Sequence, residues 1–548
     1  MQFISGKYYV KGIIASQMWQ LDYICSFSPI YVMFDKNADA MMHNLSKDLQ
    51  ESSHSFILPF RSLIEPLLVL FNAASHTVLK DREYFIDYSI PGGLYGHYKN
   101  YIPSENDIKN IEQHIRHYIR TKATLHQELM PAEKIKRYFQ EHNRRDVLHL
   151  LRSNAENLEW LEDLRIANVN GGGELFFNRI QENLTLLQDF RILKAKEGFF
   201  LISDYSFFER VLPRRLDSSK YFKRFDESHD AMAHFGISTI ADLNDVISNG
   251  GLPEFLKLSE AYQAKGFSRL ADNIIAHPLK PRVIFLSGPT SSGKTTSANR
   301  LALELKVLRK SVFILSLDNY YKPHSEIPDD PETGLKNFEL VSALNLGLFK
   351  QNIHDLLNGH PARLPKYHFD GKGGVTTGNF VHADQDAYFI VEGIHALNPD
   401  VWADIMEGNS YRLYVTALTT LNIHDHLPFS TSDHRLIRRL VRDHLFRGYG
   451  FNETLKRWPD VVRNEYLNIF PFQETAHAII NSALIYEMAV FAHYAPAILN
   501  PELAENELIR EQVLRLNRLL KLFIPIAPSD IPPTSILREF IGGSSFSY

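Results

Sequence analysis

Cysteine and long apolar runs are both scarce in this chain. Its 548 residues include a single cysteine, Cys25. One thiol cannot form an internal disulfide or a thiolate zinc site, which excludes disulfide scaffolds and iron–sulfur chemistry and favours a reducing compartment. The apolar stretch at residues 64–72 falls far short of the roughly 20 residues that cross a bilayer, and residues 1–19 lack the pattern of a signal peptide. We therefore expect a cytoplasmic protein with no membrane partner.

A strong charge of either sign is also missing. Lysine and arginine number 59 against 64 acidic residues, a formal net charge of −5. No general positive field therefore attracts nucleic acid, although a local basic patch is compatible with this balance. The hydrophobic share of 44% is enough for large cores, and we find no fixed-period repeat of the kind that builds solenoids. We expect two or three globular domains.

Local patterns divide the chain into four segments. Residues 1–215 mix short strand-like runs with helical ones, which predicts an α+β domain. Residues 216–277 are largely helical and form a predicted connector. Residues 278–525 alternate apolar β-type runs with helical ones, which predicts an α/β fold with a parallel sheet covered by helices. Residues 526–548 contain prolines and a Gly-Gly-Ser-Ser run, and we expect a flexible tail there.

A phosphate-binding loop follows the first apolar run of the third segment. The pattern of Val283–Ser287 predicts a buried strand, which leads directly into G-P-T-S-S-G-K-T-T and a helical pattern. Glycines let the loop bend so that backbone N–H groups face a phosphate, and the helix N-terminus adds partial positive charge. Lys294 would reach the β- and γ-phosphates of ATP, and the Thr295 hydroxyl would bind Mg²⁺. The predicted ATP-binding residues are Gly288, Pro289, Thr290, Ser291, Ser292, Gly293, Lys294, Thr295 and Thr296.

Acidic residues end the next two apolar runs of this segment. Asp318 follows residues 313–317, and Glu392 follows residues 388–391. Parallel strands place their carboxyl ends at one edge of the sheet, where open α/β sheets bind ligands. Asp318 is the candidate general base for an acceptor hydroxyl, and Glu392 is a candidate Mg²⁺ ligand. The ordinary role of an isolated acid at such a position is a helix cap or a solvated turn, but the adjacent loop favours chemistry.

Four arginines share one face of a predicted helix. Arg435, Arg438, Arg439 and Arg442 are spaced at i, i+3, i+4 and i+7. Such a stripe suits a mobile lid that closes over phosphates and neutralises the moving γ-phosphoryl group. The alternative is a basic face that pairs with acids, although arginine without lysine favours fixed phosphate geometry.

Aromatic and histidine residues near these motifs are less specific. Tyr367 and Phe369, which flank His368, suit either one wall of a base pocket or ordinary core packing. His424 and His426 have no second ligand group at zinc spacing, so we expect polar rather than metal-binding roles.

Together these motifs resemble a known family. GPTSSGKTT, SLDNYY, LPKYHF, FIVEGIHALNP and RLIRRLVRDHLFRGY are similar to the uridine kinase and phosphoribulokinase family of P-loop kinases. Residues 216–525 resemble more closely the bacterial nucleoside kinases that carry a uridine-kinase module behind a threonyl-tRNA-synthetase-like N-terminal region. Stretches such as VTALTTLNIHDH and NSALIYEMAV are similar to that subgroup rather than to the short uridine kinases.

The resemblance implies roles for individual residues. It places ATP phosphates on Gly288 to Thr296, Mg²⁺ on Thr295 and Glu392, and a ribose 5′-hydroxyl beside Asp318 as its base. It assigns nucleoside contacts to Tyr367, His368 and Arg435, and the lid to Arg438, Arg439, Arg442 and Arg447. His368 stands where the short uridine kinases have Asp, which leaves the base preference open although a uridine- or cytidine-like acceptor is favoured.

The N-terminal half is similar to part of threonyl-tRNA synthetase. The stretch FIDYSIPGGLYGHYKNYIPSENDIKNIEQHI resembles the domain that removes mischarged amino acids, but the His-x-x-x-His motif of that domain is absent and only His76 stands in the expected helix. The resemblance therefore implies assembly, regulation or residual RNA contact rather than editing. The basic stretch at residues 134–152 fits a solvated helix face better than an RNA surface.

We therefore predict ATP- and Mg²⁺-dependent phosphorylation of a nucleoside at its 5′-hydroxyl, a reaction of nucleoside salvage. Two alternatives stay open. The acceptor could be another hydroxylated metabolite, because the loop and the acids specify ATP and Mg²⁺ but not the acceptor. The chain could instead be an RNA-binding or regulatory protein switched by ATP, which would need no acceptor base. The sequence also leaves open whether the chain forms a homo-oligomer.

Overall fold

The computed structural model describes residues 57–80, 82–90, 92–153, 164–169, 173–205, 219–329, 336–368, 374–405 and 410–546. The chain divides into two compact units, residues 1–59 and 60–548, and nearly all of the described residues belong to the second unit. Cys25, Phe369 and the predicted boundary at residues 215–216 lie outside the described residues. None of the described helices is long and apolar enough to cross a membrane.

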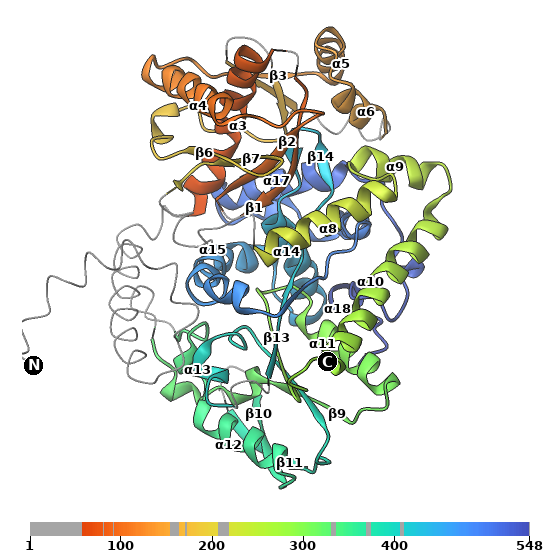
Figure 1. The fold of residues 1–548 in the computed structure, drawn as a ribbon. Coiled ribbons are helices and arrows are strands. Elements are labelled where there is room, and N and C mark those ends of the chain that lie inside the picture. Colours follow the sequence, from red (N-terminus) through yellow and green to blue (C-terminus); the bar gives the residue numbers. More distant parts are fainter. Residues whose placement is uncertain are drawn as a thin grey trace, which may run out of the picture. The chain divides into compact units, whose positions relative to one another are not determined.

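An α+β region opens the second unit (Figure 1). Its four-stranded antiparallel sheet has the order β1-β2-β7-β6, formed by Tyr84–Ile90, Gly93–Tyr98, Gly198–Ile202 and Arg191–Lys194. A three-stranded antiparallel sheet joins β3 (His126–Met130), β4 (Leu164–Asn168) and β5 (Glu174–Phe176). The helices of this region are α3 (Ile57–Leu79), α4 (Glu105–Arg120), α5 (Ala132–Glu141) and α6 (Arg145–Ser153).

Helix α4 shows how the sequence specifies these elements. The Ser104 hydroxyl accepts a hydrogen bond from the backbone N–H of Asp107, whose carboxylate accepts one from the Ser104 N–H in return. Ile108, Ile111 and Ile115 follow at helical spacing and are buried. They pack with residues of α3 and the four-stranded sheet in one apolar core.

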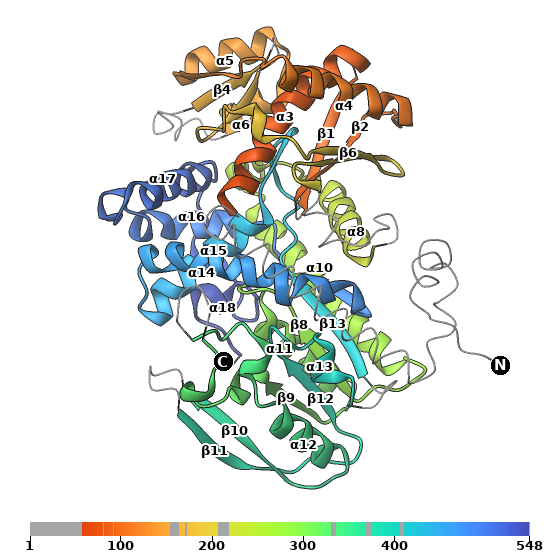
Figure 2. The same ribbon diagram turned by 90° about the vertical axis from the view of Figure 1, so that its left-hand side faces the viewer.

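Three helices, α8 (Lys220–His234), α9 (Ile240–Ser248) and α10 (Leu252–Ile275), connect this region to a parallel sheet. The sheet has five strands in the order β16-β13-β8-β12-β9 (Figure 2). In chain order they are β8 (Val283–Ser287), β9 (Val312–Ser316), β12 (Tyr388–Glu392), β13 (Ser410–Thr416) and β16 (Ala478–Asn481). The parallel sheet confirms the predicted α/β fold class.

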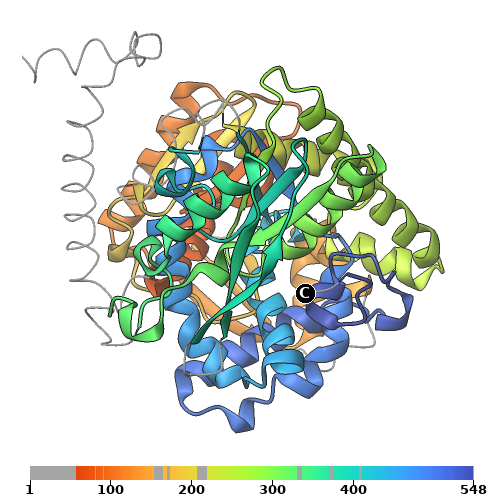
Figure 3. The same cartoon turned by 90° about the horizontal axis from the view of Figure 1, so that it is seen from below.

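Helices cover both faces of the parallel sheet (Figure 3). Helix α12 (Leu346–Leu357) packs on the face that carries Val283, Phe285 and Val391. Helix α11 (Lys294–Val307) contacts β8, β12 and β9. The remaining elements are β10 (Ala362–His368), β11 (Gly374–Val381), α13 (Pro399–Trp402), β14 (Asn422–His424), β15 (Leu427–Pro428), α14 (Thr431–Arg442), α15 (Phe451–Asn468), α16 (Glu487–Ile498), α17 (Glu507–Lys521) and α18 (Arg538–Ile541).

The strand register aligns the carboxyl ends of three strands. Glu392, the last residue of β12, pairs with Leu286 of β8 on one side and with Ser316 of β9 on the other. The segments that follow β8 and β9 therefore leave the sheet at the same level as Glu392. This alignment brings the phosphate loop, Asp318 and Glu392 to one edge of the sheet.

The β14–β15 hairpin attaches the sheet region to the α+β region. The Ile86 N–H donates to the Asp425 carbonyl at 2.8 Å, and the Asn422 side chain donates to the Ile86 carbonyl at 2.5 Å. The ring of His426 stacks on Tyr84 with centroids 4.0 Å apart. These contacts make one continuous structure of segments more than 200 residues apart in sequence.

The C-terminal segment differs from the prediction of a flexible tail. Its apolar side chains are buried, namely Ile526, Ile531, Ile536, Leu537, Phe540 and Ile541. The Arg300 side chain of α11 also donates to the Thr534 carbonyl at 3.0 Å. The prolines and glycines suggested a loose tail, but the apolar residues between them find a surface on α11 and α14, which corrects that prediction for residues 526–546.

Candidate active site

The phosphate loop joins β8 to α11 and depends on two of its glycines. Gly293 has φ of +80°, a left-handed conformation that favours glycine, and α11 begins at the next residue, Lys294. Gly288 approaches β13 so closely that a Cβ atom there would lie 2.1 Å from the Val415 carbonyl oxygen. The predicted strand, loop and helix are all present at the predicted positions.

A buried ion pair holds the first part of the loop. Arg435 donates to the Thr290 carbonyl at 3.2 Å and forms an ion pair with Glu465. The same Glu465 carboxylate accepts a hydrogen bond from the Thr290 N–H at 3.1 Å. Both backbone groups of Thr290 are therefore satisfied by this pair of side chains.

A second buried ion pair holds the next residue of the loop. Arg438 donates to the Ser291 carbonyl at 3.1 Å and pairs with Glu487 at 2.7 Å, and the side chains of both Arg438 and Glu487 are 0% exposed. His434 also hydrogen bonds to Glu487, at 2.7 Å. A charge this deeply buried is tolerated only when it is paired and fully hydrogen bonded, so the pair fixes the loop firmly.

Asp318 and Glu392 lie close enough to Lys294 to alter its protonation. Burial lowers the pKa of Lys294, and the negative charges of Glu392 and Asp318 raise it. Burial raises the pKa of Glu392, as does the negative charge of Asp318, while a hydrogen bond from Ser316 lowers it. Packing around Asp318, which is itself accessible to solvent on the turn Leu317–Tyr320, raises its pKa, and Lys294 lowers it. The structure thus brings together the loop lysine and the two acids that the sequence singled out.

Comparison with known proteins agrees with this geometry. Residues 283–487 match the model of the phosphoribulokinase / uridine kinase family. The uridine kinase of Bacillus pumilus (strain SAFR-032) is 30% identical over 184 residues, which are 34% of this chain and 78% of that protein. The chain belongs to the phosphoribulokinase/uridine kinase family.

Two further similarities concern the same family. The uridine kinase of Staphylococcus haemolyticus (strain JCSC1435) is 29% identical over 201 residues, which are 36% of this chain and 86% of that protein. A solved structure described as a possible uridine kinase from Bacillus stearothermophilus is 21% identical, covers 27% of this chain and 78% of that chain, and has a TM-score of 0.23. The family match over residues 283–487 identifies the C-terminal region as a P-loop kinase domain.

Two arginines of the kinase domain lie elsewhere than predicted. We expected Arg435 at the nucleoside and Arg438 in a lid, but both are buried beneath the loop and already paired with Glu465 and Glu487. The helical spacing correctly groups the arginines on α14. It could not show that this face meets buried acids, because those acids come from other helices, α15 and α16.

The other arginines of this region have different partners. Arg442 donates to the Ser291 hydroxyl at 3.2 Å. Arg439 and Arg447 both donate to the Asp443 carboxylate, at 3.2 and 3.3 Å. The Arg447 side chain is 47% exposed and lowers the pKa of Asp318, so it lies on the same side of the site as the candidate base.

Tyr367 and His368 end strand β10, beside the turn that carries Asp318. The Asn319 side chain accepts a hydrogen bond from the Tyr367 N–H at 3.4 Å. The Tyr367 ring lies 5.6 Å from Tyr321 and 6.3 Å from Phe338, both edge-on. An aromatic wall therefore stands next to the candidate base, and His368 follows it directly.

Several acids of this site carry no sequence signal that we recognised. Glu465 and Glu487 form ion pairs with Arg435 and Arg438, which hold the loop. Glu339 is a third such acid: Lys294 and Asp318 are among its neighbours, and burial raises its pKa to about 7. These acids belong to no motif, and only the need of each buried arginine for a partner could have suggested them.

Glu539 of α18 lies at the N-terminus of α11. Its carboxylate accepts hydrogen bonds from the Thr296 N–H at 3.2 Å and from the Thr296 hydroxyl at 2.7 Å. Arg442 lies 3.4 Å from the same carboxylate. The segment that we expected to be a flexible tail thus places an anion at the predicted phosphate site.

Proposed function

We propose that this chain transfers the γ-phosphoryl group of ATP to the 5′-hydroxyl of a nucleoside, with a uridine- or cytidine-like acceptor. One observation carries the proposal: Lys294 of the phosphate loop shares its surroundings with Asp318 and Glu392, at the ends of three adjacent strands. A protein that only binds ATP as a switch has no use for a base beside the loop. The names of the curated relatives support a nucleoside as acceptor.

Each residue has a definite task in this reaction. The loop N–H groups and Lys294 bind the phosphates, and Arg439, Arg442 and Arg447 supply positive charge near the transferred group. Asp318 orients the acceptor hydroxyl and takes its proton as the new O–P bond forms and the bond to the β-phosphate oxygen breaks. Tyr367 and His368 stand where the nucleoside would lie.

The oxygen donors of the site suit Mg²⁺. Glu392 is buried at the sheet edge, and its burial and the negative charge of Asp318 raise its pKa, an effect that a bound cation would relieve. Thr295 and Glu392 would hold the ion, which when bound neutralises charge on the β- and γ-phosphates.

We propose that the N-terminal half is related to the editing region of threonyl-tRNA synthetase. We also propose that the boundaries between the segments of the chain follow residues 215, 277 and 525. The resembling stretch forms the β1–β2 hairpin and α4, so it folds as one piece. His76 is exposed on α3, and the described residues contain no group of three or more possible metal ligands. We propose a role in assembly or regulation for this region rather than hydrolysis, with RNA contact disfavoured.

The acceptor hydroxyl is tested with uridine and 5′-deoxyuridine, each mixed with ATP and Mg²⁺. We expect uridine to yield ADP and a nucleoside monophosphate in equal amounts, and 5′-deoxyuridine to yield neither. Equal ADP release with both would show that the 5′-hydroxyl is not the acceptor. Sugar phosphates and pantothenate in the same assay test the alternative acceptors, and phosphorylation of one of these with no nucleoside turnover would contradict the proposal.

A further inference from the structure

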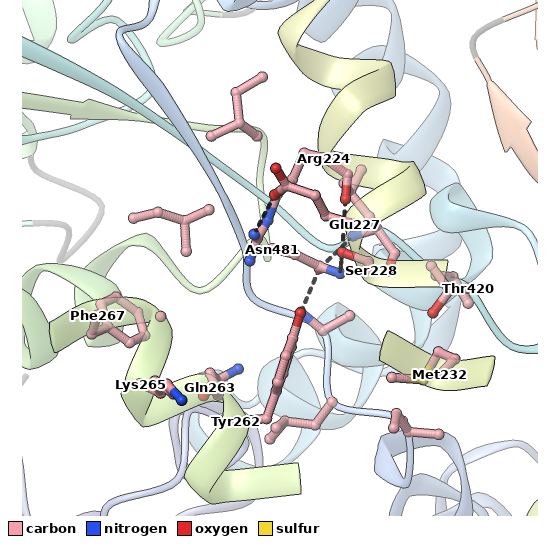
Figure 4. A pocket seen from close by; sticks show the side chains of 18 of the residues that line it. Arg224, Glu227, Ser228, Met232, Tyr262, Gln263, Lys265, Phe267, Thr420 and Asn481 are labelled. Atoms are coloured by element: carbon pink, nitrogen blue, oxygen red, sulfur yellow. Dashed lines mark hydrogen bonds and ion pairs between the residues drawn. The ribbon is translucent and has the colours of Figure 1, made fainter. Parts of the chain in front are cut away.

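A cavity lies between α8, α10 and strand β16 (Figure 4). Its volume is about 590 Å³, within the range of about 300–1,000 Å³ that is usual for small-molecule sites. Figure 4 shows Tyr262, Gln263, Lys265 and Phe267 on α10, and Arg224, Glu227 and Ser228 on α8. Within the described part of the chain, no residue of the predicted active site lines this cavity.

The charged lining of this cavity is strongly unbalanced. Among the described residues its only acid is Glu227, which pairs with Arg224 at 3.0 Å. Its lysines and arginines are Lys220, Lys223, Arg224, Lys265 and Arg269. Cations gathered around a concave site raise the local concentration of anions, so the expected ligand carries negative charge.

Two buried polar atoms of the cavity lack a hydrogen-bond partner among the described residues, and they indicate which groups a ligand should carry. The Gln263 Oε1 atom is an acceptor without a donor, and the Arg224 Nε–H is a donor without an acceptor. Gln263 is 8% exposed, so the missing partner must reach it from the cavity or from a trapped water. A ligand with a ring N–H and an anionic group would satisfy both atoms.

Aromatic rings supply the third element of the site. Tyr262 and Phe235 line it, with ring centroids 6.0 Å apart and edge-on, and Phe267 lies along the same helix as Tyr262. Tyr262 is 37% exposed, which leaves part of its ring open for stacking.

The cavity is linked to the phosphate loop by one shared acceptor. The Ser482 carbonyl accepts from Gln263 at 3.3 Å and from Arg438 at 3.0 Å. Arg438 in turn donates to the Ser291 carbonyl of the loop. A ligand that moves Gln263 therefore acts on the residue that holds the loop.

We propose that this cavity is a second nucleotide-binding site, for a nucleoside polyphosphate whose ring carries N–H donors, and that its occupancy alters ATP binding at the loop. The second half of the proposal rests on the proposed ATP site, whereas the binding itself does not.

Guanosine triphosphate is the probe, because its guanine base carries a ring N–H donor and an amino group beside it. It is titrated calorimetrically into the full chain after the loop has been filled with a non-hydrolysable ATP analogue. We expect a second binding event whose affinity falls about tenfold or more in Lys265→Glu/Arg269→Glu, where two attractive charges become repulsive. Lys257→Glu, an exposed residue of the same helix outside the cavity, is the matched control and is expected to keep the wild-type affinity. Gln263→Met should weaken guanosine triphosphate but not inorganic triphosphate.

The outcomes separate the two halves of the proposal. No second binding event, or one that the double substitution leaves unchanged, would overturn the site. An ATP-analogue affinity that is the same with and without guanosine triphosphate would overturn the coupling. If the analogue never binds, the proposed kinase function fails, while the guanosine triphosphate titration still decides the cavity.

An independent observation concerns Glu539 and Phe540. The N-terminal N–H groups of a helix bind anions, and the Thr296 N–H already donates to the Glu539 carboxylate. Phe540 lies beneath the guanidinium groups of Arg438 and Arg442, 4.8 and 5.7 Å from its ring centroid. An acid thus occupies the predicted phosphate site, and the buried aromatic ring that follows it packs against two arginines that contact the loop. The geometry points to a C-terminal segment that competes with ATP for the loop.

Binding of the ATP analogue to full-length variants tests this competition. Glu539→Gln removes the anion, and we expect its affinity for the analogue to rise about threefold or more, because the helix N-terminus is no longer neutralised. Asp530→Asn, an exposed acid of the same segment, is the control and should not change the affinity. Hydrogen exchange of residues 534–541 should increase when the analogue binds to the wild-type chain. Unchanged or weaker binding by Glu539→Gln, or unchanged exchange, would overturn the competition, whereas no binding by any variant would overturn the ATP site itself.

Discussion

Two carboxylates at one sheet edge have different surroundings and therefore suit different tasks. Glu392 is 6% exposed at the end of a central strand, whereas Asp318 lies on an accessible turn beside two cations. A buried acid whose pKa stays raised although Lys294 lies nearby is suited to hold a further cation. An accessible acid can meet a hydroxyl that enters from solvent, and the positive charges of Lys294 and Arg447 favour its ionised form against the packing around it, which raises its pKa.

The pH dependence of turnover should follow the protonation of Asp318. A base must be ionised, so kcat/KM falls as the pH drops through the pKa of Asp318. Arg447 lowers that pKa, so Arg447→Met is expected to raise it and to move the acidic limb of the pH profile to higher pH. Because the Arg447 side chain is 47% exposed, the shift should shrink at high ionic strength.

The control for this pH experiment is Lys456→Met. That lysine is 52% exposed, pairs with Glu505 and does not influence the pKa of Asp318. An acidic limb at the same pH in the wild-type chain and in Arg447→Met would remove Asp318 from the role of base.

At the scale of elements, helix α14 holds the phosphate loop in place and is not a free lid. Arg435 and Arg438 each join a carboxylate of another helix to a carbonyl of the loop. The loop geometry therefore exists before ATP arrives, which lowers the cost of ordering the site on binding.

Breaking the ion pair between Arg438 and Glu487 should destabilise the protein measurably. Glu487→Gln leaves the Arg438 charge buried without its counterion and also removes the partner of His434. We expect a loss of about 3–5 kcal/mol in the free energy of unfolding, measured with urea. Glu502→Gln, an exposed acid nearby in sequence, should change it by less than about 0.5 kcal/mol. If Glu487→Gln also lowered the free energy of unfolding by less than about 0.5 kcal/mol, the ion pair would not be what holds the loop.

The sequence could predict the elements of this site but not their partners. The strand–loop–helix at residues 283–307, the acid just after β9 and the acid that ends β12 are local patterns, and each was predictable because the carboxyl ends of parallel strands share an edge. Glu465, Glu487 and Glu539 join the site through tertiary packing, which leaves no local pattern. The prediction for the segment after residue 526 was wrong for the same reason, since its isoleucines need a surface that only the fold provides.

At the scale of the whole molecule, a cluster of buried charges joins the α+β region to the kinase domain. Arg144 pairs with Glu174 at 2.9 Å and with Asp146 at 2.8 Å. His426 of the β14–β15 hairpin reaches the same Glu174 at 2.6 Å. The hairpin leads directly into α14, so the N-terminal half is connected to the helix that holds the phosphate loop.

Removing Arg144, the central cation of this cluster, should lower the free energy of unfolding by an amount that depends on pH. Burial raises the pKa of Glu174, but Arg144 and the hydrogen bond to His426 outweigh burial and lower it to about 2 against an ordinary value of 4.5. Glu174 therefore contributes stability above pH 4.5 that is lost as the pH falls towards 2. Arg144→Met is expected to cost about 3–5 kcal/mol at pH 7 and less as the pH falls and the carboxylates become protonated.

Arg145→Met is the matched control for that variant, because Arg145 is the adjacent residue and is exposed. Urea unfolding at pH 7 and at pH 4 provides the measurement. An equal cost for Arg144→Met at both pH values, or no cost at pH 7, would show that the cluster does not hold the two regions together.

The most direct test of the central claim is nucleoside-dependent ADP release by the wild-type chain, Lys294→Ala and Asp318→Asn, measured across ribo- and deoxyribonucleosides. The account predicts that at least one nucleoside drives ADP release by the wild-type chain, and that Lys294→Ala abolishes it. It further predicts that Asp318→Asn lowers turnover by about 10²–10⁴-fold while an ATP analogue still binds. Undiminished turnover in Asp318→Asn, or no nucleoside that drives release although the analogue binds, would contradict the claim that the loop, Asp318 and Glu392 form one phosphoryl-transfer site.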